Sequence, residues 1–397
     1  MTDHKPLLLL RGANAWAPWA MGDLDILLGG GRILALGPNL EAPATLTRTI
    51  DAHHLRAVPG FIDGHVHLLG GGGEGGFATR TPELRFGDAA LAGITTVVGC
   101  LGTDGVTRSL EGLLAKARSL GEQGISAFIL SGSYGIPPLT LTGSVERDLL
   151  LIDMVIGAGE LALSDHRSSQ PGFESFVRTV AECRRGGMLA GKAGIVTVHL
   201  GDGAAGMAML RRMVAETEIP ATQVWPTHVN RNPELFAEAI AFARAGGYVD
   251  ITTSGVPRFY ETGTVPPAAA LRRLLEAGVD PSRATFTSDG QGSLPVYEVD
   301  GSLSGLAVGG VESLSQGFRD AVQAEGVGFE HALRAVTSNP ATLLRLADRG
   351  RLEAGLRADL LLLHPDSLTI HTVISGGRVL VEDGIQRIHG AFEEEPG

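Results

Sequence analysis

Short apolar runs recur along the middle of the chain, between residues 58 and 350, and most of them are separated by segments with helical spacing. The runs are FIDGHVHLL, ITTVVGCLG, SAFILSGSYG, ELALSDHR, IVTVHLGD, VWPTHVNRN, YVDITTSG and ATFTSDGQG. Segments such as LEGLLAKARSL and PELFAEAIAFARAGG lie between them, with apolar residues at the three- and four-residue intervals of a helix face. Near-continuous apolar strands that alternate with helices indicate a parallel sheet buried on both faces. The pattern predicts an α/β fold, a (β/α)8 TIM barrel over residues 58–350.

The two ends of the chain follow a different pattern. Residues 1–57 alternate short apolar runs with glycine-rich turns, and ADLLLLHP and HTVISGGRVLVEDG repeat this style within residues 351–397. Such alternation is typical of β-hairpins. We therefore expect residues 1–57 and 351–397 to build one small β domain together.

Polar side chains occur at the end of each apolar run of the middle region. They are His65 and His67, Thr103, Tyr134, Asp165, His199, His228, Thr252 and Asp289. Alternate residues of a strand face the same side, so the two imidazoles of His65-Val66-His67 can bind one ion. Barrel enzymes keep their chemistry at the carboxyl ends of their strands. Four histidines and one aspartate at that end predict a site for zinc or a similar divalent cation.

Composition and charge narrow the class of protein. Hydrophobic residues make up 44% of the chain and charged residues 19%, which excludes a disordered chain. The net charge of −12 argues against a nucleic-acid partner, because phosphate binding needs a basic surface. Apolar runs are too short for a membrane span or a signal-peptide core. Cys100 and Cys183 lack metal-site spacing, and we interpret both as reduced core residues in apolar surroundings. We expect a cytoplasmic protein without a membrane partner.

Several longer motifs make the chain recognisable. PGFIDGHVHLLGGGGEGG, TGSVERD, SDHRS, PTHVNRN and SDGQGS resemble motifs of the amidohydrolase superfamily and, within it, of the bacterial isoaspartyl (β-aspartyl) dipeptidases. The resemblance covers nearly the whole chain. It implies a metal-dependent (β/α)8 barrel with a small β-sandwich domain formed from both termini. It also implies a small peptide substrate, and we expect a homo-oligomer.

The resemblance also implies a binuclear zinc site. His65 and His67 would hold the first ion together with Asp289, and His199 and His228 would hold the second. A hydroxide bridging the ions would attack the β-aspartyl amide carbonyl, because two cations lower the pKa of the water and polarise the carbonyl.

Other residues take catalytic or binding roles by the same resemblance. Asp289 would move a proton from the hydroxide to the leaving amine, and Tyr134 would stabilise the oxyanion. Arginine suits a substrate carboxylate because of its bidentate geometry. The residues that would surround the substrate are Gly72, Glu74, Thr103, Tyr134, Arg167, Arg231 and Ser293.

One position departs from the family pattern. The relatives bridge their two ions with a carbamylated lysine, and this chain has Glu160 in the lysine's place. Glu160 carries the same charge on a shorter side chain, so the backbone must lie closer to the metals, which the neighbouring Gly157 and Gly159 permit. The alternative is one ion, or two ions held more weakly. None of the three lysines is placed to be carbamylated: Lys5, Lys116 and Lys192.

Two competing functions remain at this point. Another amidohydrolase, acting on N-acyl amino acids or cyclic amides, would keep the metal residues but lack the paired arginines and Glu74, which are present here. A catalytically inactive scaffold relative would have lost metal-binding histidines, and all four are retained.

Overall fold

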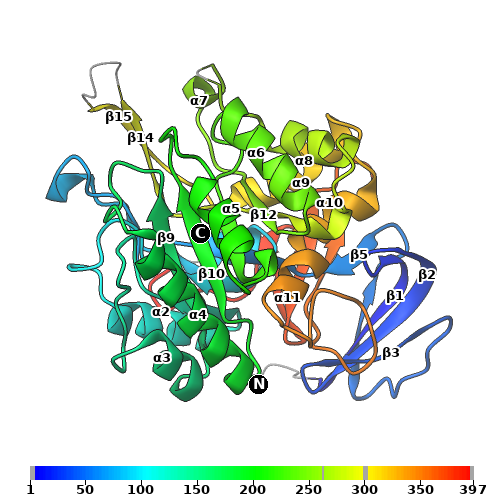
Figure 1. Cartoon of the computed structure of the whole chain (residues 1–397). Helices are drawn as coiled ribbons and strands as arrows, with labels where there is room; N and C mark the ends of the chain where they lie inside the picture. The colour runs from blue at the N-terminus through cyan, green and yellow to red at the C-terminus, as the bar shows by residue number, and fades with distance from the viewer. Residues whose placement is uncertain (1–4, 262, 298–302, 394–397) are drawn as a thin grey trace.

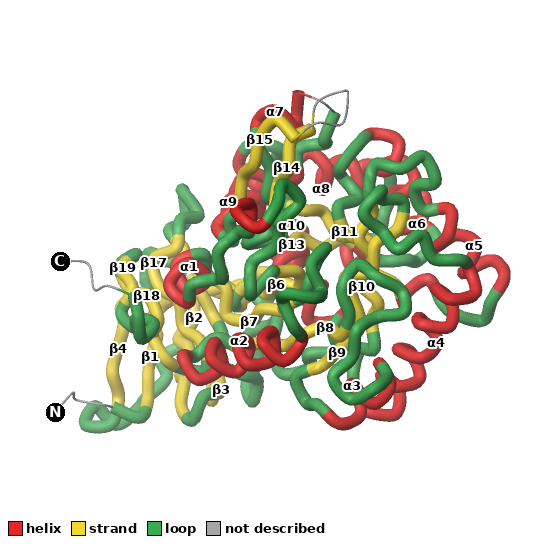
Figure 2. The backbone as a smooth tube through the Cα atoms, turned by 90° about the vertical axis from the view of Figure 1, so that its left-hand side faces the viewer, coloured by secondary structure: helices red, strands yellow, loops and turns green. Residues whose placement is uncertain are grey.

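The computed structural model describes residues 5–261, 263–297 and 303–393. Strands from both ends of the chain form one sheet, on the left in Figure 2, where the two termini also lie. The N-terminal strands are β1 (Leu7–Trp16), β2 (Ala20–Gly29), β3 (Arg32–Gly37), β4 (Thr47–Asp51) and β5 (Arg56–Pro59). The C-terminal strands are β16 (Leu360–Leu363), β17 (Ile370–Ser375), β18 (Arg378–Glu382) and β19 (Ile385–Gln386).

Within the described residues this sheet has the order β19-β18-β17-β16-β5-β1-β2-β3, and β4 pairs with β1. The two ends of the chain meet where β5 pairs antiparallel with β16. Leu10 and Ile26 from one end and Leu360 and Leu362 from the other belong to a single hydrophobic cluster. The two ends therefore depend on each other for burial of their apolar side chains.

The barrel strands correspond to the eight apolar runs. They are β6 (Phe61–Val66), β7 (Ile94–Gly99), β8 (Ser126–Ser131), β9 (Val155–Leu163), β10 (Ile195–Leu200), β11 (Val224–Thr227), β12 (Val249–Thr252) and β13 (Ala284–Thr287). Every residue of β6, β7, β9 and β10 is buried, as expected for a parallel sheet covered on both faces. The predicted fold class is confirmed.

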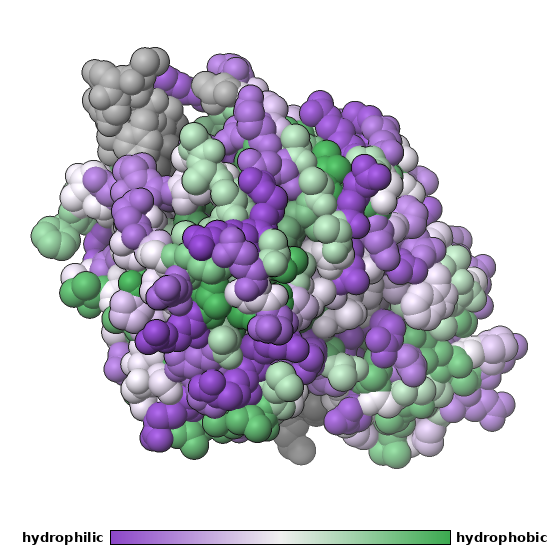
Figure 3. Space-filling model, viewed as in Figure 1, coloured by the Kyte–Doolittle hydropathy of each residue, from purple (hydrophilic) through white to green (hydrophobic). Residues whose placement is uncertain are grey.

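The helices cover the outside of the barrel (Figure 1). They are α1 (Phe86–Leu91), α2 (Leu110–Gln123), α3 (Val145–Leu151), α4 (Phe173–Ala190), α5 (Ala208–Glu216), α6 (Pro233–Arg244), α7 (Pro257–Glu261), α8 (Pro267–Glu276), α9 (Glu312–Gln323), α10 (Phe329–Val336) and α11 (Ser338–Leu343). Three of them begin at side-chain caps, in which Ser109, Ser144 and Asn232 accept backbone N–H groups of the first turn. Among the described helices, none has the length and apolar character needed to cross a membrane. Figure 3 shows hydrophilic residues spread over one face, with hydrophobic areas between them.

The barrel ladder is interrupted beside β12 and β13. Strands β6 to β11 form one parallel sheet, and β12 pairs with β13 in a separate parallel sheet, as far as the described residues go. Isolated backbone hydrogen bonds, such as that from Val229 N to the carbonyl oxygen of Asp250 at 3.2 Å, and side chains join the two sheets instead. The buried carboxylate of Asp250 on β12 accepts hydrogen bonds from Thr227 on β11 (2.7 Å) and Thr287 on β13 (2.6 Å). On the other side, Asp63 on β6 accepts the backbone N–H of Ser288 at 3.1 Å.

Candidate active site

A cavity of about 830 Å³ opens at the carboxyl ends of the barrel strands. The hairpin of β14 (Ser293–Tyr297) and β15 (Leu303–Val308) projects near this end, as does α7 (Figure 1). Ser293 and Leu294 of the hairpin line the cavity together with Phe259 of α7. The predicted site residues that line it are Gly72, Glu74, His67, Thr103, Tyr134, Glu160, Arg167, His199, His228, Arg231, Asp289 and Ser293.

Four predicted ligands gather around one point at the end of β6. The Nε2 atoms of His65 and His67 each lie 3.3 Å from an oxygen of Glu160. Asp289 Oδ1 lies 3.1 Å from His67 Nε2 and 3.6 Å from His65 Nε2. Each of the four residues is at most 9% exposed. His65, His67 and Glu160 belong to one group of possible metal ligands, and Asp289 belongs to a second group with His65 and His228.

The other two histidines form a second group around the same carboxylate. His199 Nδ1 lies 3.2 Å from Glu160 Oε2, and His228 Nε2 lies 3.6 Å from it. The other ring nitrogen of each histidine contacts a residue outside this group. His199 Nε2 lies 3.0 Å from Asp165 Oδ2, and His228 Nδ1 lies 2.6 Å from Thr252 Oγ1. Such outer contacts fix the tautomer of a metal-binding histidine. The carboxylate of Glu160 therefore contacts histidines of both groups.

A β-bulge brings Glu160 to this position. Between β9 and β10 the register advances by three residues on β9, from Ala158 to Leu161, and by two on β10. The extra residue redirects the side chain into the barrel. A Cβ at Gly159, where φ is +148°, would lie 2.8 Å from the carbonyl oxygen of Thr197, so the close approach of the two strands requires glycine. Glu160 lies inside β9, three residues before its carboxyl end.

The protonation states of His228, Glu160 and Asp289 suit a metal site. Despite burial, Cys100 and the neighbouring carboxylates raise the pKa of His65 and His67 well above the usual value, so a cation would have to displace their protons. Burial lowers the pKa of His228 to about 3, which keeps the imidazole neutral with a free lone pair. Burial opposes ionisation of Glu160, but His65 and the other imidazoles outweigh it and hold its pKa well below the usual range. Burial also opposes ionisation of Asp289, and His67 and His228 lower its pKa on balance.

The donor set fits a divalent cation. Among the described residues, the buried Oδ1 of Asp289 has no hydrogen-bond partner, although it faces two imidazoles. Two buried carboxylates and four imidazoles form a site of nitrogen and oxygen ligands, which is the chemistry that zinc and similar cations prefer. Buried carboxylates of this kind require a compensating positive charge.

A second cluster lies in the same cavity, next to the metal ligands. Arg167 pairs with Glu74 at 3.1 Å and with Asp165 at 2.8 Å, and Thr103 donates to Glu74 at 3.3 Å. The hydroxyl of Tyr134 lies 3.0 Å from His199 Nδ1. Burial raises the pKa of Tyr134 well above its usual value, so its hydroxyl keeps its proton.

Other polar atoms in the cavity are available to a ligand. Within the described part of the chain, Glu74 Oε2, Arg231 Nε and Ser293 Oγ are buried without hydrogen-bond partners. Arg231 Nη1 lies 3.7 Å from Asp202 Oδ2. Gly72 packs against Ser293, where a Cβ on Gly72 would lie 3.0 Å from that of Ser293. The structure thus brings the predicted substrate residues to one cavity.

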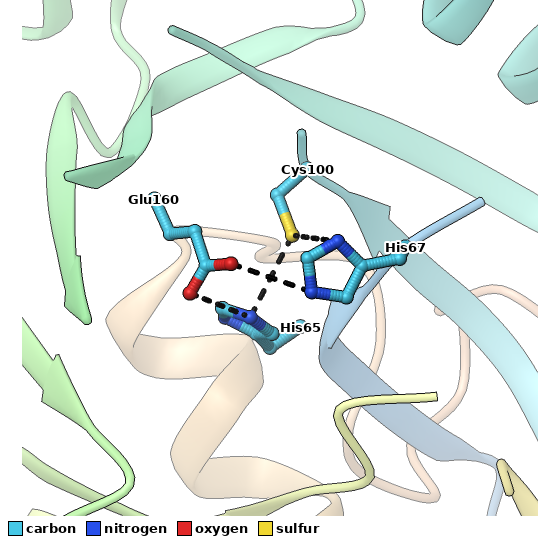
Figure 4. A group of neighbouring side chains, drawn as sticks. All are labelled: His65, His67, Cys100 and Glu160. Atoms are coloured by element: carbon cyan, nitrogen blue, oxygen red, sulfur yellow. Dashed lines mark hydrogen bonds and ion pairs between the residues drawn. The ribbon is translucent and has the colours of Figure 1, made fainter. Parts of the chain in front are cut away.

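Sequence reasoning missed three contacts of this site. Asp165 and Thr252 were recognised only as polar residues at strand ends, and they hold His199 and His228. Cys183 and Cys100 both belong to hydrophobic clusters, as predicted, but Cys100 Sγ also lies 3.6 Å from His65 Nε2 (Figure 4), a contact that the prediction did not include. Cys100 directly follows β7, so the strand-end rule could have identified it had cysteine been treated as polar.

Carboxylates and imidazoles gathered at the mouth of a (β/α)8 barrel define a metal-dependent hydrolase. The model of the amidohydrolase family matches residues 236–381. The structure of the β-aspartyl dipeptidase of Fervidobacterium islandicum AW-1 in complex with β-Asp-Leu is 42% identical, with a TM-score of 0.91, and the match covers 98% of this chain and all of that chain. A deacetylase of Agrobacterium fabrum is 27% identical, over 90% of this chain and 81% of its own length. This chain belongs to the amidohydrolase family.

Proposed function

We propose that this amidohydrolase cleaves the β-aspartyl amide bond of small dipeptides with the help of two zinc ions. The observation that carries the proposal is the charged cluster of Glu74, Arg167 and Arg231 in the cavity of the metal ligands. A β-aspartyl unit presents both a free α-ammonium and a free α-carboxylate, which such a cluster can pair. The 42% identical relative bound to β-Asp-Leu supports the same substrate class.

The ions would be held by the two groups described above. His65, His67 and Asp289 would bind one ion, His199 and His228 the other, with Glu160 between them. When bound, two divalent cations lower the pKa of a water molecule between them and polarise the substrate carbonyl.

The chain's own residues bind and orient the substrate. The Glu74 carboxylate, whose Oε2 has no hydrogen-bond partner among the described residues, would accept the α-ammonium. Arg167 and Arg231 would bind the α-carboxylate, and bidentate guanidinium contacts would fix its orientation. Gly72, Thr103 and Ser293 would complete the pocket around the ammonium. A substrate held at both groups places its scissile carbonyl reproducibly, which lowers the entropic cost of the reaction.

Two residues handle proton and charge during bond cleavage. Asp289 has a lowered pKa and is ionised at neutral pH, so it can accept the proton of the attacking water and pass it to the leaving amine. Tyr134 keeps its hydroxyl proton because burial raises its pKa. That hydroxyl would donate a hydrogen bond to the carbonyl oxygen as negative charge develops there.

The test compares β-Asp-Leu, α-Asp-Leu and an N-acetyl amino acid as substrates of the zinc-loaded protein. We expect turnover of β-Asp-Leu and little turnover of the other two. Equal rates on the two aspartyl isomers would contradict the proposal, and preference for the acetylated substrate would favour the deacylase alternative. Glu74→Gln should abolish most β-Asp-Leu turnover, whereas Glu83→Gln, at a side chain that is 58% exposed, serves as the matched control.

A further inference from the structure

Cys100 belongs to the first group of metal ligands by its position. It is 1% exposed, and its Sγ lies 3.6 Å from His65 Nε2 and 4.0 Å from His67 Nδ1. Figure 4 shows Cys100, Glu160, His65 and His67 directed toward one point from four sides. Each of these four side chains offers a donor atom within 4.8 Å of the other three.

Two of the six separations between these donors, Cys100 Sγ to His65 Nε2 and Glu160 Oε1 to His67 Nε2, agree with the edges of a zinc tetrahedron. Bonds of about 2.3 Å to sulfur and about 2.05 Å to nitrogen or oxygen, at the tetrahedral angle, give edges of about 3.6 Å for S···N and about 3.4 Å for N···O. The observed values are 3.6 Å for Cys100 Sγ to His65 Nε2 and 3.3 Å for Glu160 Oε1 to His67 Nε2.

A second observation points independently to a cation at this place. The Oδ1 of Asp289, a residue that is 9% exposed, is buried and has no hydrogen-bond partner within the described part of the chain. It lies 3.1 Å from His67 Nε2 and 3.6 Å from His65 Nε2, so it faces the two histidines that lie beside Cys100.

The other cysteine, Cys183, has the environment of a structural thiol. Cys183 on α4 is fully buried, and its Sγ lies 3.4 Å from the carbonyl oxygen of Ile195. It belongs to none of the groups of possible metal ligands found among the described residues. Burial raises the pKa of the Cys183 thiol, so it stays protonated. The chain has two cysteines, and this contrast makes Cys183 a matched control.

We infer that the Cys100 thiolate is a ligand of the cation that His65, His67 and Glu160 would hold. The inference rests on the metal site of the proposed function. On binding, the S–H bond breaks, the proton leaves to solvent, and the sulfur–metal bond forms. A thiolate added to two imidazoles and a carboxylate selects a thiophilic cation such as zinc over magnesium, calcium or manganese. The first metal position thus differs chemically from the second, which has only imidazoles and the shared carboxylate.

Cobalt substitution of the full-length enzyme tests this ligand directly, because a thiolate bound to Co²⁺ gives an intense sulfur-to-metal charge-transfer band in the near ultraviolet. Wild-type protein and Cys183→Ala should show the band. Cys100→Ala and the isosteric Cys100→Ser should lose it while they keep the weaker visible bands of bound cobalt. Zinc retention against a chelator should also fall at least about tenfold in both Cys100 variants.

X-ray absorption of the zinc-loaded wild-type enzyme provides a measurement that needs no variant. We expect a sulfur scatterer at about 2.3 Å from zinc. A wild-type enzyme that hydrolyses β-Asp-Leu, binds cobalt fully and shows neither the band nor the sulfur scatterer would overturn this inference and leave the proposed function intact. A protein that binds neither cobalt nor zinc would overturn both.

Discussion

Replacing Asp165 with asparagine tests how the second group of metal ligands is held. Asp165 Oδ1 accepts hydrogen bonds from the backbone N–H of Arg167 at 2.7 Å and from its Nε at 3.0 Å. Oδ2 lies 2.8 Å from Arg167 Nη2 and 3.0 Å from His199 Nε2. All of these neighbours are donors when His199 binds a metal through Nδ1, and a carboxylate satisfies them all.

Asparagine cannot satisfy these donors in either orientation of its amide. Whichever way the amide turns, its NH2 group faces two donors, so two charge-assisted hydrogen bonds are lost, each worth about 1.5–3 kcal/mol. With the NH2 group toward His199, the histidine loses the contact that fixes its tautomer, and with the amide oxygen toward it, the histidine keeps only a weaker, neutral acceptor. We expect metal affinity at the second position to fall about 10–100-fold, the usual effect of removing such an outer partner.

The assay measures zinc content after dialysis against a graded chelator, together with kcat/KM on β-Asp-Leu. Asp153→Asn is the control, since Asp153 is exposed and lies in the turn before the same strand, β9. Thermal unfolding of the metal-free proteins separates a folding defect from a metal defect. Zinc retention and kcat/KM indistinguishable from wild type would refute the reasoning, because they would show that His199 needs no acceptor at Nε2.

Three further predictions concern residues that the proposed function assigns to the substrate or the metals. Asp289→Asn should keep most of its metal, because the amide oxygen can still bind, yet lose activity by several orders of magnitude in kcat, since it cannot carry the proton; substantial turnover at saturating zinc would assign the proton transfer elsewhere. Arg231→Ala should cost at least about 2 kcal/mol in kcat/KM for β-Asp-Leu, and near-wild-type kinetics would exclude Arg231 from substrate binding. Metal-free protein should regain full activity with zinc whether or not bicarbonate is present, because Glu160 needs no carbamylation. The Glu160→Gln variant should lose at least one ion. Full metal content in that variant would show that Glu160 is not a ligand.

The barrel was predictable because its strands are buried on both faces and read as continuous apolar runs. The same runs placed His65, His199 and His228 at strand ends, and the structure brings them together around one carboxylate. These features depend on local pattern and on the shared direction of parallel strands, which the sequence carries directly.

Other features depend on pairing between distant segments and could not be predicted. The bulge that directs Glu160 inward exists only in the register of β9 against β10. A bulge breaks the two-residue alternation that is used to predict which face of the sheet each side chain lies on. The partners of Asp165 and Thr252 are likewise distant in sequence. Cys100 was assigned to the core because cysteine is commonly buried as a small hydrophobe, and burial alone does not reveal the histidines beside it.

The interruption of the barrel ladder has a consequence for how this protein gains its stability. Among the described residues, no backbone ladder joins β11 to β12, and the candidate ligands come from both sides of that break. His199 lies in β10 and His228 follows β11 of the six-stranded sheet, whereas Asp289 follows β13 of the separate pair. Bound ions would therefore cross-link two sheets that no continuous backbone ladder joins there, and every ion that binds the folded state alone adds RT ln(1 + [ion]/Kd) to the free energy of unfolding. In this fold the concentration of metal ions would therefore affect the stability of the barrel as well as its catalytic activity.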